Sequence, residues 1–244
     1  QVRLAPDALR VTYTWQPELL ASARALALTP AEQDGLAAAH QRLVEVMNRV
    51  GAGRRSADLG EVLVPLLQEA GAGAATGQRA AAYRYALFVT AAQLSGKNVA
   101  LLVPAIQRRP RPLTLTLHGR HDLAQHFAIS AALAAWAGEP LANTIGLDKE
   151  VDDARGGSGF SFADLAADRA GTRFGELAVH RPTHLANILS GGVDALMPPI
   201  DGLPEHLMSD EFARRFGTVG SPAYQGVVAE IERRIAALAL FQSP

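Results

Sequence analysis

Apolar residues recur at helical spacing through most of the chain. The clearest case follows Thr29-Pro30-Ala31-Glu32, where a capping threonine, a proline at the first helical position and a glutamate three residues after the cap predict a helix start. The apolar stripe that follows stops at Gly51–Gly53, so one amphipathic helix is expected between these two signals. A second cap-and-proline pair, Ser221-Pro222, predicts a last helix that continues to about Leu240.

The same periodicity predicts six more helices, over Ala57–Ala70, Arg79–Leu94, Asp122–Ala137, Pro140–Asp153, Phe162–Val179 and Pro182–Leu189. Pro65 lies inside the first of these, so that helix is expected to be kinked or split there. Alternating apolar and polar residues predict two short strands, at Leu9–Thr14 and Leu113–Leu117. The elements show no internal repeat, which argues against a solenoid.

These elements predict a mainly α fold: a single globular helical domain with one or two short minor strands. Residues 1–16 are expected to form an extended N-terminal arm, and residues 17–244 the domain. Within the domain, the helices of residues 17–105 would support a site-bearing half, residues 113–244. No stretch between these halves has the composition of a flexible linker.

Composition narrows the classes of function. Hydrophobic residues make up 48% of the chain and charged residues 19%, which is typical of a globular protein rather than a disordered one. A formal charge of -1 argues against a nucleic-acid binder. No uninterrupted apolar window is long enough for a membrane span, so a soluble protein is expected. The absence of cysteine excludes disulfides and thiolate ligands. Together with the missing initiator methionine, it favours the periplasm, with the cytoplasm as the alternative.

Candidate chemistry concentrates between residues 113 and 176. His118 ends the predicted strand at Leu113–Leu117, while Asp122 and His126 lie one turn apart on the helix that follows. The three side chains could therefore converge, and burying two imidazoles with a carboxylate is costly without a partner or an ion. The alternative is a buried hydrogen-bond network, because a histidine on an apolar helix face is more often a core residue than a ligand.

A glycine-rich turn, Gly156-Gly157-Ser158-Gly159, follows the helix predicted at Pro140–Asp153. It precedes a helix start in which Ser161 and Asp164 have capping-box spacing. Free backbone amides at such a turn can hold an anion, so the turn supplies candidate substrate-binding residues, namely Gly157, Ser158, Gly159 and Ser161. The alternative is a tight loop that needs glycine for conformational reasons. The segment matches neither a nucleotide P-loop nor a nucleophile elbow.

The next helix carries a local resemblance to a known family. Asp164-Leu165-Ala166-Ala167-Asp168 with Gly171 resembles the third-ligand helix of gluzincin-type zinc peptidases, in which an acidic residue is followed by two others, Ala-Asp and a nearby glycine. The resemblance implies that Asp164 binds the metal directly and that Asp168 supports the metal site without binding the ion itself. The chain has no HExxH motif, so the resemblance supplies no general base.

Longer blocks resemble a family of uncharacterised bacterial proteins, which implies no particular activity. These blocks are HGRHDLAQHFAISAAL, GGSGFSFADLAADRAG and DEFARRFGTVGSPAYQ.

The first hypothesis is a metal-dependent hydrolase that acts on peptide or cell-envelope substrates. Its metal, zinc or another divalent ion, would be held by His118, His126 and either Asp164 or Asp122, with Asp168 in support. Asp122 or Glu150 would be the catalytic base.

The second hypothesis is a non-catalytic helical protein of the cell envelope. In it the histidine–aspartate cluster is a structural network, and the glycine turn shapes a surface for a protein or glycan partner. A third hypothesis, a glycan-cleaving enzyme, would use Glu150 as its acid.

Overall fold

Helices make up most of the chain that the computed structural model describes, which comprises residues 2–5, 8–11, 28–74, 76–101, 103–137 and 159–242. The mainly α prediction is confirmed. The α-helices within these ranges are α2 (Pro30–Val50), α3 (Leu59–Ala72), α4 (Arg79–Leu94), α5 (His121–Ala137), α7 (Phe162–His180), α8 (Pro182–Gly191), α9 (Ser209–Phe216) and α10 (Pro222–Ala236). Short 3-10 turns are η1 (Thr76–Gln78), η2 (Val99–Leu101) and η3 (Ala239–Phe241).

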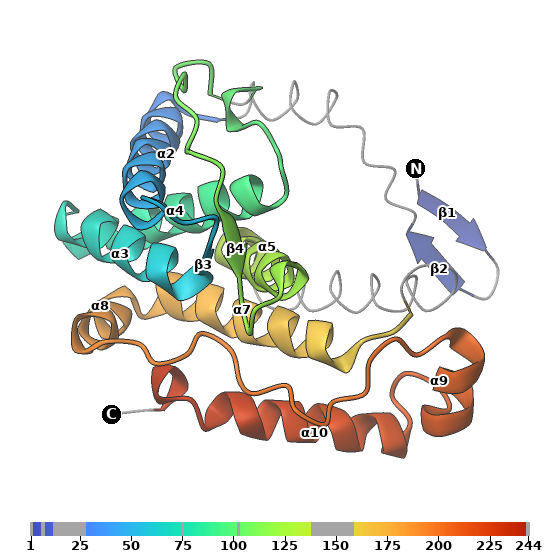
Figure 1. Cartoon of the computed structure of the whole chain (residues 1–244). Helices are drawn as coiled ribbons and strands as arrows, with labels where there is room; N and C mark the ends of the chain where they lie inside the picture. Colours follow the sequence, from blue (N-terminus) through green and yellow to red (C-terminus); the bar gives the residue numbers. More distant parts are fainter. Residues whose placement is uncertain are drawn as a thin grey trace.

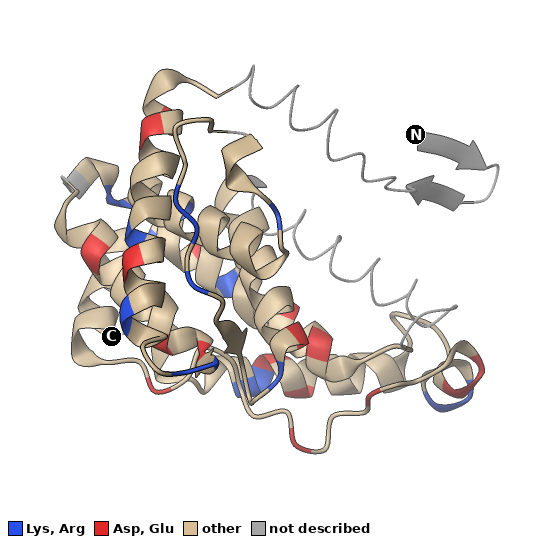
Figure 2. Ribbon diagram, turned by 45° about the horizontal axis from the view of Figure 1, so that its top comes forward, with Lys and Arg blue, Asp and Glu red and all other residues tan. Residues whose placement is uncertain are grey.

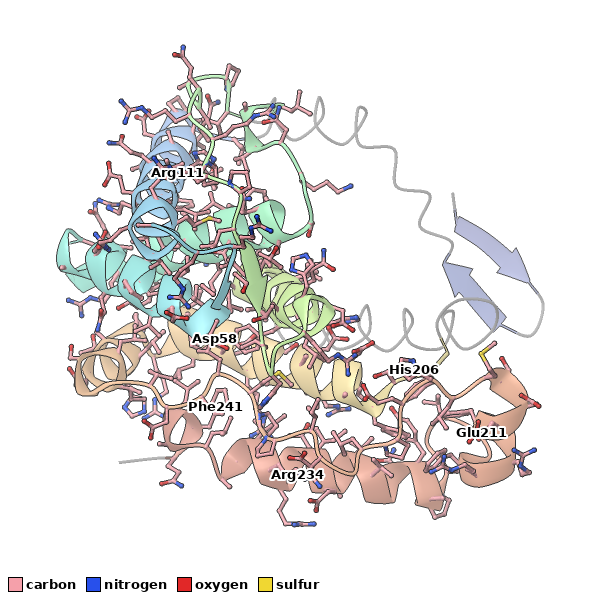
Figure 3. The ribbon with its side chains drawn as sticks, viewed as in Figure 1. Asp58, Arg111, His206, Glu211, Arg234 and Phe241 are labelled. Atoms are coloured by element: carbon pink, nitrogen blue, oxygen red, sulfur yellow. The ribbon has the colours of Figure 1, made fainter. Side chains whose placement is uncertain are left out.

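Helix starts follow the capping signals of the sequence. At α2 the Thr29 hydroxyl accepts from the Glu32 amide at 3.3 Å, and the Glu32 carboxylate accepts from the Thr29 amide at 2.8 Å. Asp58 caps α3 in the same way (Figure 3). Helix α3 continues through Pro65, so it is not split there. A fully buried apolar face, which includes Val62 and Leu66, holds this helix together despite the lost amide.

Four short strands accompany the helices in the described ranges. β1 (Val2–Ala5) pairs antiparallel with β2 (Ala8–Val11), which overlaps the strand predicted at Leu9–Thr14. β4 (Thr114–Thr116) confirms the strand predicted at Leu113–Leu117, and it pairs in parallel with β3 (Ser56–Asp58). β3 was not predicted, because its three residues fall at the start of a helical pattern. The β3–β4 pair leads the chain directly into the turn before α5.

The pair α5 and α7 lies at the centre of the core. Figure 1 shows α10 running alongside α7, with α2, α3 and α4 on its other side. One continuous hydrophobic core includes residues from both predicted halves of the domain, from Leu36 to Leu240. The proposed division at residues 16, 105 and 113 stays a prediction.

Two glycines let α5 and α7 approach closely. A Cβ atom built on Gly171 would lie 2.2 Å from the backbone oxygen of Phe127, and one on Gly175 would lie 2.2 Å from that of Ala131. Real Cβ atoms do not come this close to an oxygen, so neither position tolerates a side chain without moving a helix. The two contacts fix the register of α7 against α5, one turn apart on each helix.

An aromatic cluster fixes the start of α7. Its rings stack at centroid separations of 4.7–6.3 Å and belong to Phe160, Phe162, Phe212, Phe216 and Tyr224. Two of these rings come from α9, a helix that the periodicity did not predict.

The last predicted helix was too long: α10 ends at Ala236, and η3 follows. Arg234 of α10 donates to the carbonyls of Pro199 at 2.9 Å and Asp201 at 3.0 Å, which ties the preceding loop to this helix (Figure 3).

Within the described ranges, no helix has both the length and the apolarity that crossing a membrane requires. Basic and acidic residues are interspersed along the helices and connectors (Figure 2). The helix predicted at Pro140–Asp153 lies outside the described residues.

His40 makes stability sensitive to mild acid. Its side chain is buried on α2, and this burial lowers the pKa of His40 below its usual value of 6.5. The unfolded chain therefore binds a proton more readily than the folded one. The contribution of neutral His40 to the free energy of unfolding is fully present above about pH 6.5. It falls as the pH drops from there towards the lowered pKa of the folded state. Urea denaturation at about pH 8 and about pH 5.5 should show a smaller loss for His40→Gln than for the unchanged protein. An equal loss in both proteins would contradict this assignment.

Candidate functional site

A tight turn delivers the chain from β4 into α5. Leu117 and Arg120 exchange two backbone hydrogen bonds of 2.9 Å across it. The two residues between them, His118 and Gly119, have φ angles of 49° and 74°. Glycine adopts such angles without strain, whereas a histidine needs the surrounding contacts to hold it there. Arg120 is thereby placed at the first turn of α5.

His126 and Asp168 form the buried centre of the site. His126 Nδ1 lies 3.1 Å from Asp168 Oδ1 and 3.2 Å from Oδ2. The Ser130 hydroxyl, one turn further along α5, donates to the same carboxylate at 2.7 Å. All three side chains are buried, so Asp168 of α7 accepts hydrogen bonds from two residues of α5. This network spans the same helix pair that Gly171 and Gly175 hold together.

Asp164 lies on the opposite side of the imidazole. It is one turn before Asp168 on α7, and its Oδ2 atom is 3.6 Å from His126 Nε2. Its other oxygen is 3.3 Å from Nη2 of Arg120. The backbone amide of Asp164 donates to the Ser161 hydroxyl at 3.1 Å, which confirms Ser161 as the cap of α7. The imidazole of His126 is thus held between two aspartates.

Arg120 joins this centre to the surface. Its guanidinium bonds both oxygens of Asp122, at 2.6 Å and 3.2 Å, and also forms an ion pair with Glu205. Glu205 in turn accepts from the Ser161 hydroxyl at 3.3 Å. The hydrogen bond from Arg120 lowers the pKa of Asp122, and the same bond raises the pKa of Arg120. Both groups are therefore charged at neutral pH.

Among the described residues, this network contains four carboxylates, namely Asp122, Asp164, Asp168 and Glu205. Arg120 contacts three of them. Carboxylates brought together in a partly buried site favour a further positive charge, either a protonated imidazole or a bound cation.

The structure brings together some of the predicted site residues and separates others. His126, Asp164 and Asp168 are in contact, and Asp122 joins them through Arg120. His118 instead places Nε2 3.0 Å from the carbonyl oxygen of Pro198. In the described part of the chain, no group of three histidine, aspartate or glutamate side chains is arranged to hold a metal ion.

The predicted glycine turn is only partly described. Gly159 has a φ of 88°, and a Cβ atom there would lie 2.7 Å from the backbone of His206 (Figure 3). The neighbouring Phe160 forms an isolated bridge with Leu207, so this glycine lets two chain segments pack together. Three other predicted site residues lie outside the described residues: Glu150, Gly157 and Ser158.

Sequence reasoning missed three members of the network. Arg120 lies between His118 and His126, and Ser130 lies one turn after His126, but neither was considered as part of the site. Glu205 lies 85 residues from Arg120 in the chain, and no local pattern connects the two. An arginine directly before a helix that carries two candidate ligands was the one available signal.

Comparison of the chain with protein-family models, with curated proteins and with solved structures found no match.

Proposed function

We propose that the chain is a metal-dependent hydrolase in which His126 and Asp164 hold a divalent ion, zinc or another metal. The observation that carries the proposal is the 3.6 Å separation of His126 Nε2 from Asp164 Oδ2. This separation is too long for a direct N–H···O hydrogen bond. It suits two ligands of one ion: with metal–ligand bonds of about 2.0–2.2 Å, it gives an N–metal–O angle of about 120°.

Asp168 supports this assignment by orienting the imidazole. A metal-binding histidine commonly donates its other ring N–H to a carboxylate, which fixes the tautomer. Here Asp168 lies at Nδ1, so an N–H on that nitrogen leaves the Nε2 lone pair directed towards Asp164. A catalytic zinc site keeps at least one position for water, which is the nucleophile that hydrolysis requires.

Asp122 is a poor candidate for the catalytic base of this reaction. Its lowered pKa makes its carboxylate a poor proton acceptor at neutral pH, and its hydrogen bonds to Arg120 occupy both oxygens. A metal ion reduces the need for a strong base, because it lowers the pKa of its own bound water. A bound ion would therefore supply the water activation, and Asp122 and Arg120 would have a positioning role. Peptide or cell-envelope bonds are the proposed substrates.

Metal content tests the proposal. Protein purified without an affinity tag or chelator should carry about one equivalent of zinc or another divalent ion by mass spectrometry. His126→Ala and Asp164→Asn should each lose it, while remaining folded by circular dichroism. His180→Ala is the matched control, because His180 is exposed at the end of α7 and pairs with Glu176. Protein that holds no ion and gains no thermal stability from added zinc would rule out the metal site.

The same measurement separates a second candidate, a non-catalytic protein that binds a protein or glycan partner. One observation favours it: Asp168 accepts from both His126 and Ser130, as it would in a network built to lock two helices together. It predicts that His126→Ala lowers stability in a protein that is already free of metal. Metal bound by the unchanged protein and lost from the variant would exclude it.

A further inference from the structure

A pocket lies beside α8, the helix that follows α7. Residues of α3, α4 and α8 line an open-sided cavity of about 420 Å³ there, which is within the size range of pockets for small molecules. Helix α8 begins two residues after α7 ends (Figure 1), whereas Asp164 and Asp168 lie in the first two turns of α7. The main lining groups are Gln68, Gly71, Arg79, Tyr83, Asn187 and Leu189.

Tyr83 places a polar group at the cavity wall. Its side chain is only 1% exposed, and its hydroxyl lies against Gly71, where a Cβ atom would come within 2.6 Å of the oxygen. None of the hydrogen bonds formed among the described residues involves this hydroxyl. Burial raises the pKa of Tyr83, with a smaller opposing effect from Arg79, so the hydroxyl is protonated and can donate at neutral pH. A donor at a cavity wall that has no partner among the described residues is available to a ligand or to water.

Arg79 supplies a positive charge to the same cavity. It lies one turn before Tyr83 on α4, and its Nε donates to the Gly71 carbonyl at 3.4 Å. That bond anchors the guanidinium at the cavity and leaves its two terminal amino groups for other acceptors. The residues that line the cavity include no aspartate or glutamate that would neutralise this charge. Gln68 is committed elsewhere, since its amide donates to the Leu189 carbonyl at 2.7 Å.

We propose that this cavity binds a small organic carboxylate, with Arg79 and the Tyr83 hydroxyl as its two anchoring donors. The two oxygens of a planar carboxylate can accept hydrogen bonds from the N–H groups of a guanidinium and from one hydroxyl. A phosphate group carries more charge and more oxygens, and sites for it recruit further cations or backbone amides, which the lining set does not provide. The body of the ligand would lie against Ala72, Ala186 and Leu189, with Asn187 at the rim.

Titration with benzoate tests the proposal on the intact chain. Protein carrying ¹³C in its tyrosine rings gives a Tyr83 signal, identified as the one missing from Tyr83→Phe. Benzoate should shift that signal with a Kd of about 10 mM or tighter for a ligand of this size. Its neutral analogue benzamide should bind at least about tenfold more weakly, and Arg79→Gln should weaken benzoate binding by a similar factor.

Tyr85→Phe is the matched control, because Tyr85 lies on α4 beside Tyr83 but does not line the cavity. Its benzoate affinity should equal that of the unchanged protein. Three results would overturn the proposal: no shift of the Tyr83 signal at saturating benzoate, equal affinity for benzamide, or tighter binding of inorganic phosphate than of benzoate. Unchanged affinity in a folded Arg79→Gln protein would also overturn it.

Discussion

Gly171→Ala and Gly175→Ala should each destabilise the protein by about 1–3 kcal/mol or more. The added methyl group would lie 2.2 Å from a backbone oxygen of α5, at Phe127 in the first case and Ala131 in the second. A carbonyl inside a helix cannot rotate away without breaking that helix, so α5 and α7 must separate. Separation loses contacts along the most extensive helix pair of the core.

Gly226→Ala is the control for helix propensity. Gly226 is an exposed residue of α10, and a Cβ atom there would meet no other atom within 4 Å. This substitution should raise the free energy of unfolding by up to about 1 kcal/mol. Guanidinium denaturation followed by circular dichroism gives all three values. If Gly171→Ala and Gly175→Ala change the free energy of unfolding as Gly226→Ala does, the prediction is wrong. Helices α5 and α7 can then move apart at little cost.

Asp168→Ala should lower the free energy of unfolding by about 1–3 kcal/mol for each buried donor that it leaves without an acceptor. The substitution removes the acceptor of two buried donors, His126 Nδ1 and the Ser130 hydroxyl. No other described acceptor is bonded to the Ser130 hydroxyl. A cavity adds to the loss, since Asp168 is only 4% exposed.

Asp122→Ala is the comparison for Asp168→Ala. Asp122 also forms an ion pair, with Arg120, but its side chain is 50% exposed, so its removal should cost about 0–1 kcal/mol. Asp168→Asn should fall between the two, because the amide keeps the shape and one acceptor oxygen. Urea denaturation at neutral pH measures each. A loss below that of Asp122→Ala would show that Asp168 contributes little to holding α5 and α7 together.

Local signals in the sequence predicted the helices well. Capping residues and proline placed the starts of α2, α8 and α10, and continuous apolar periodicity gave the bounds of α4. Helix α9 was missed because Phe212 and Phe216 are its only buried residues, and two positions do not establish a period. β3 was missed because three residues are too few to show alternation.

The structure brings His126 into contact with Asp164 and Asp168, and their role as a site stays a prediction. His126 was singled out by its place on an apolar helix, and the two aspartates by the resemblance to a zinc-peptidase helix. His118 was expected to converge with Asp122 and His126, but its side chain lies against Pro198 instead. Its backbone is left-handed, and helical spacing does not predict the direction of a side chain there. The pairing of Arg120 with Glu205 depends on tertiary structure alone.

The close approach of α5 and α7 also constrains how this sequence can diverge. Most core contacts join two side chains, so a change in one can be compensated by a change in the other. At Gly171 and Gly175 the atoms encountered are backbone oxygens of Phe127 and Ala131. Every amino acid presents the same oxygen there, so no substitution in α5 can make room for a side chain in α7. Among descendants of this chain, residues 127 and 131 should vary in type while both glycines stay fixed.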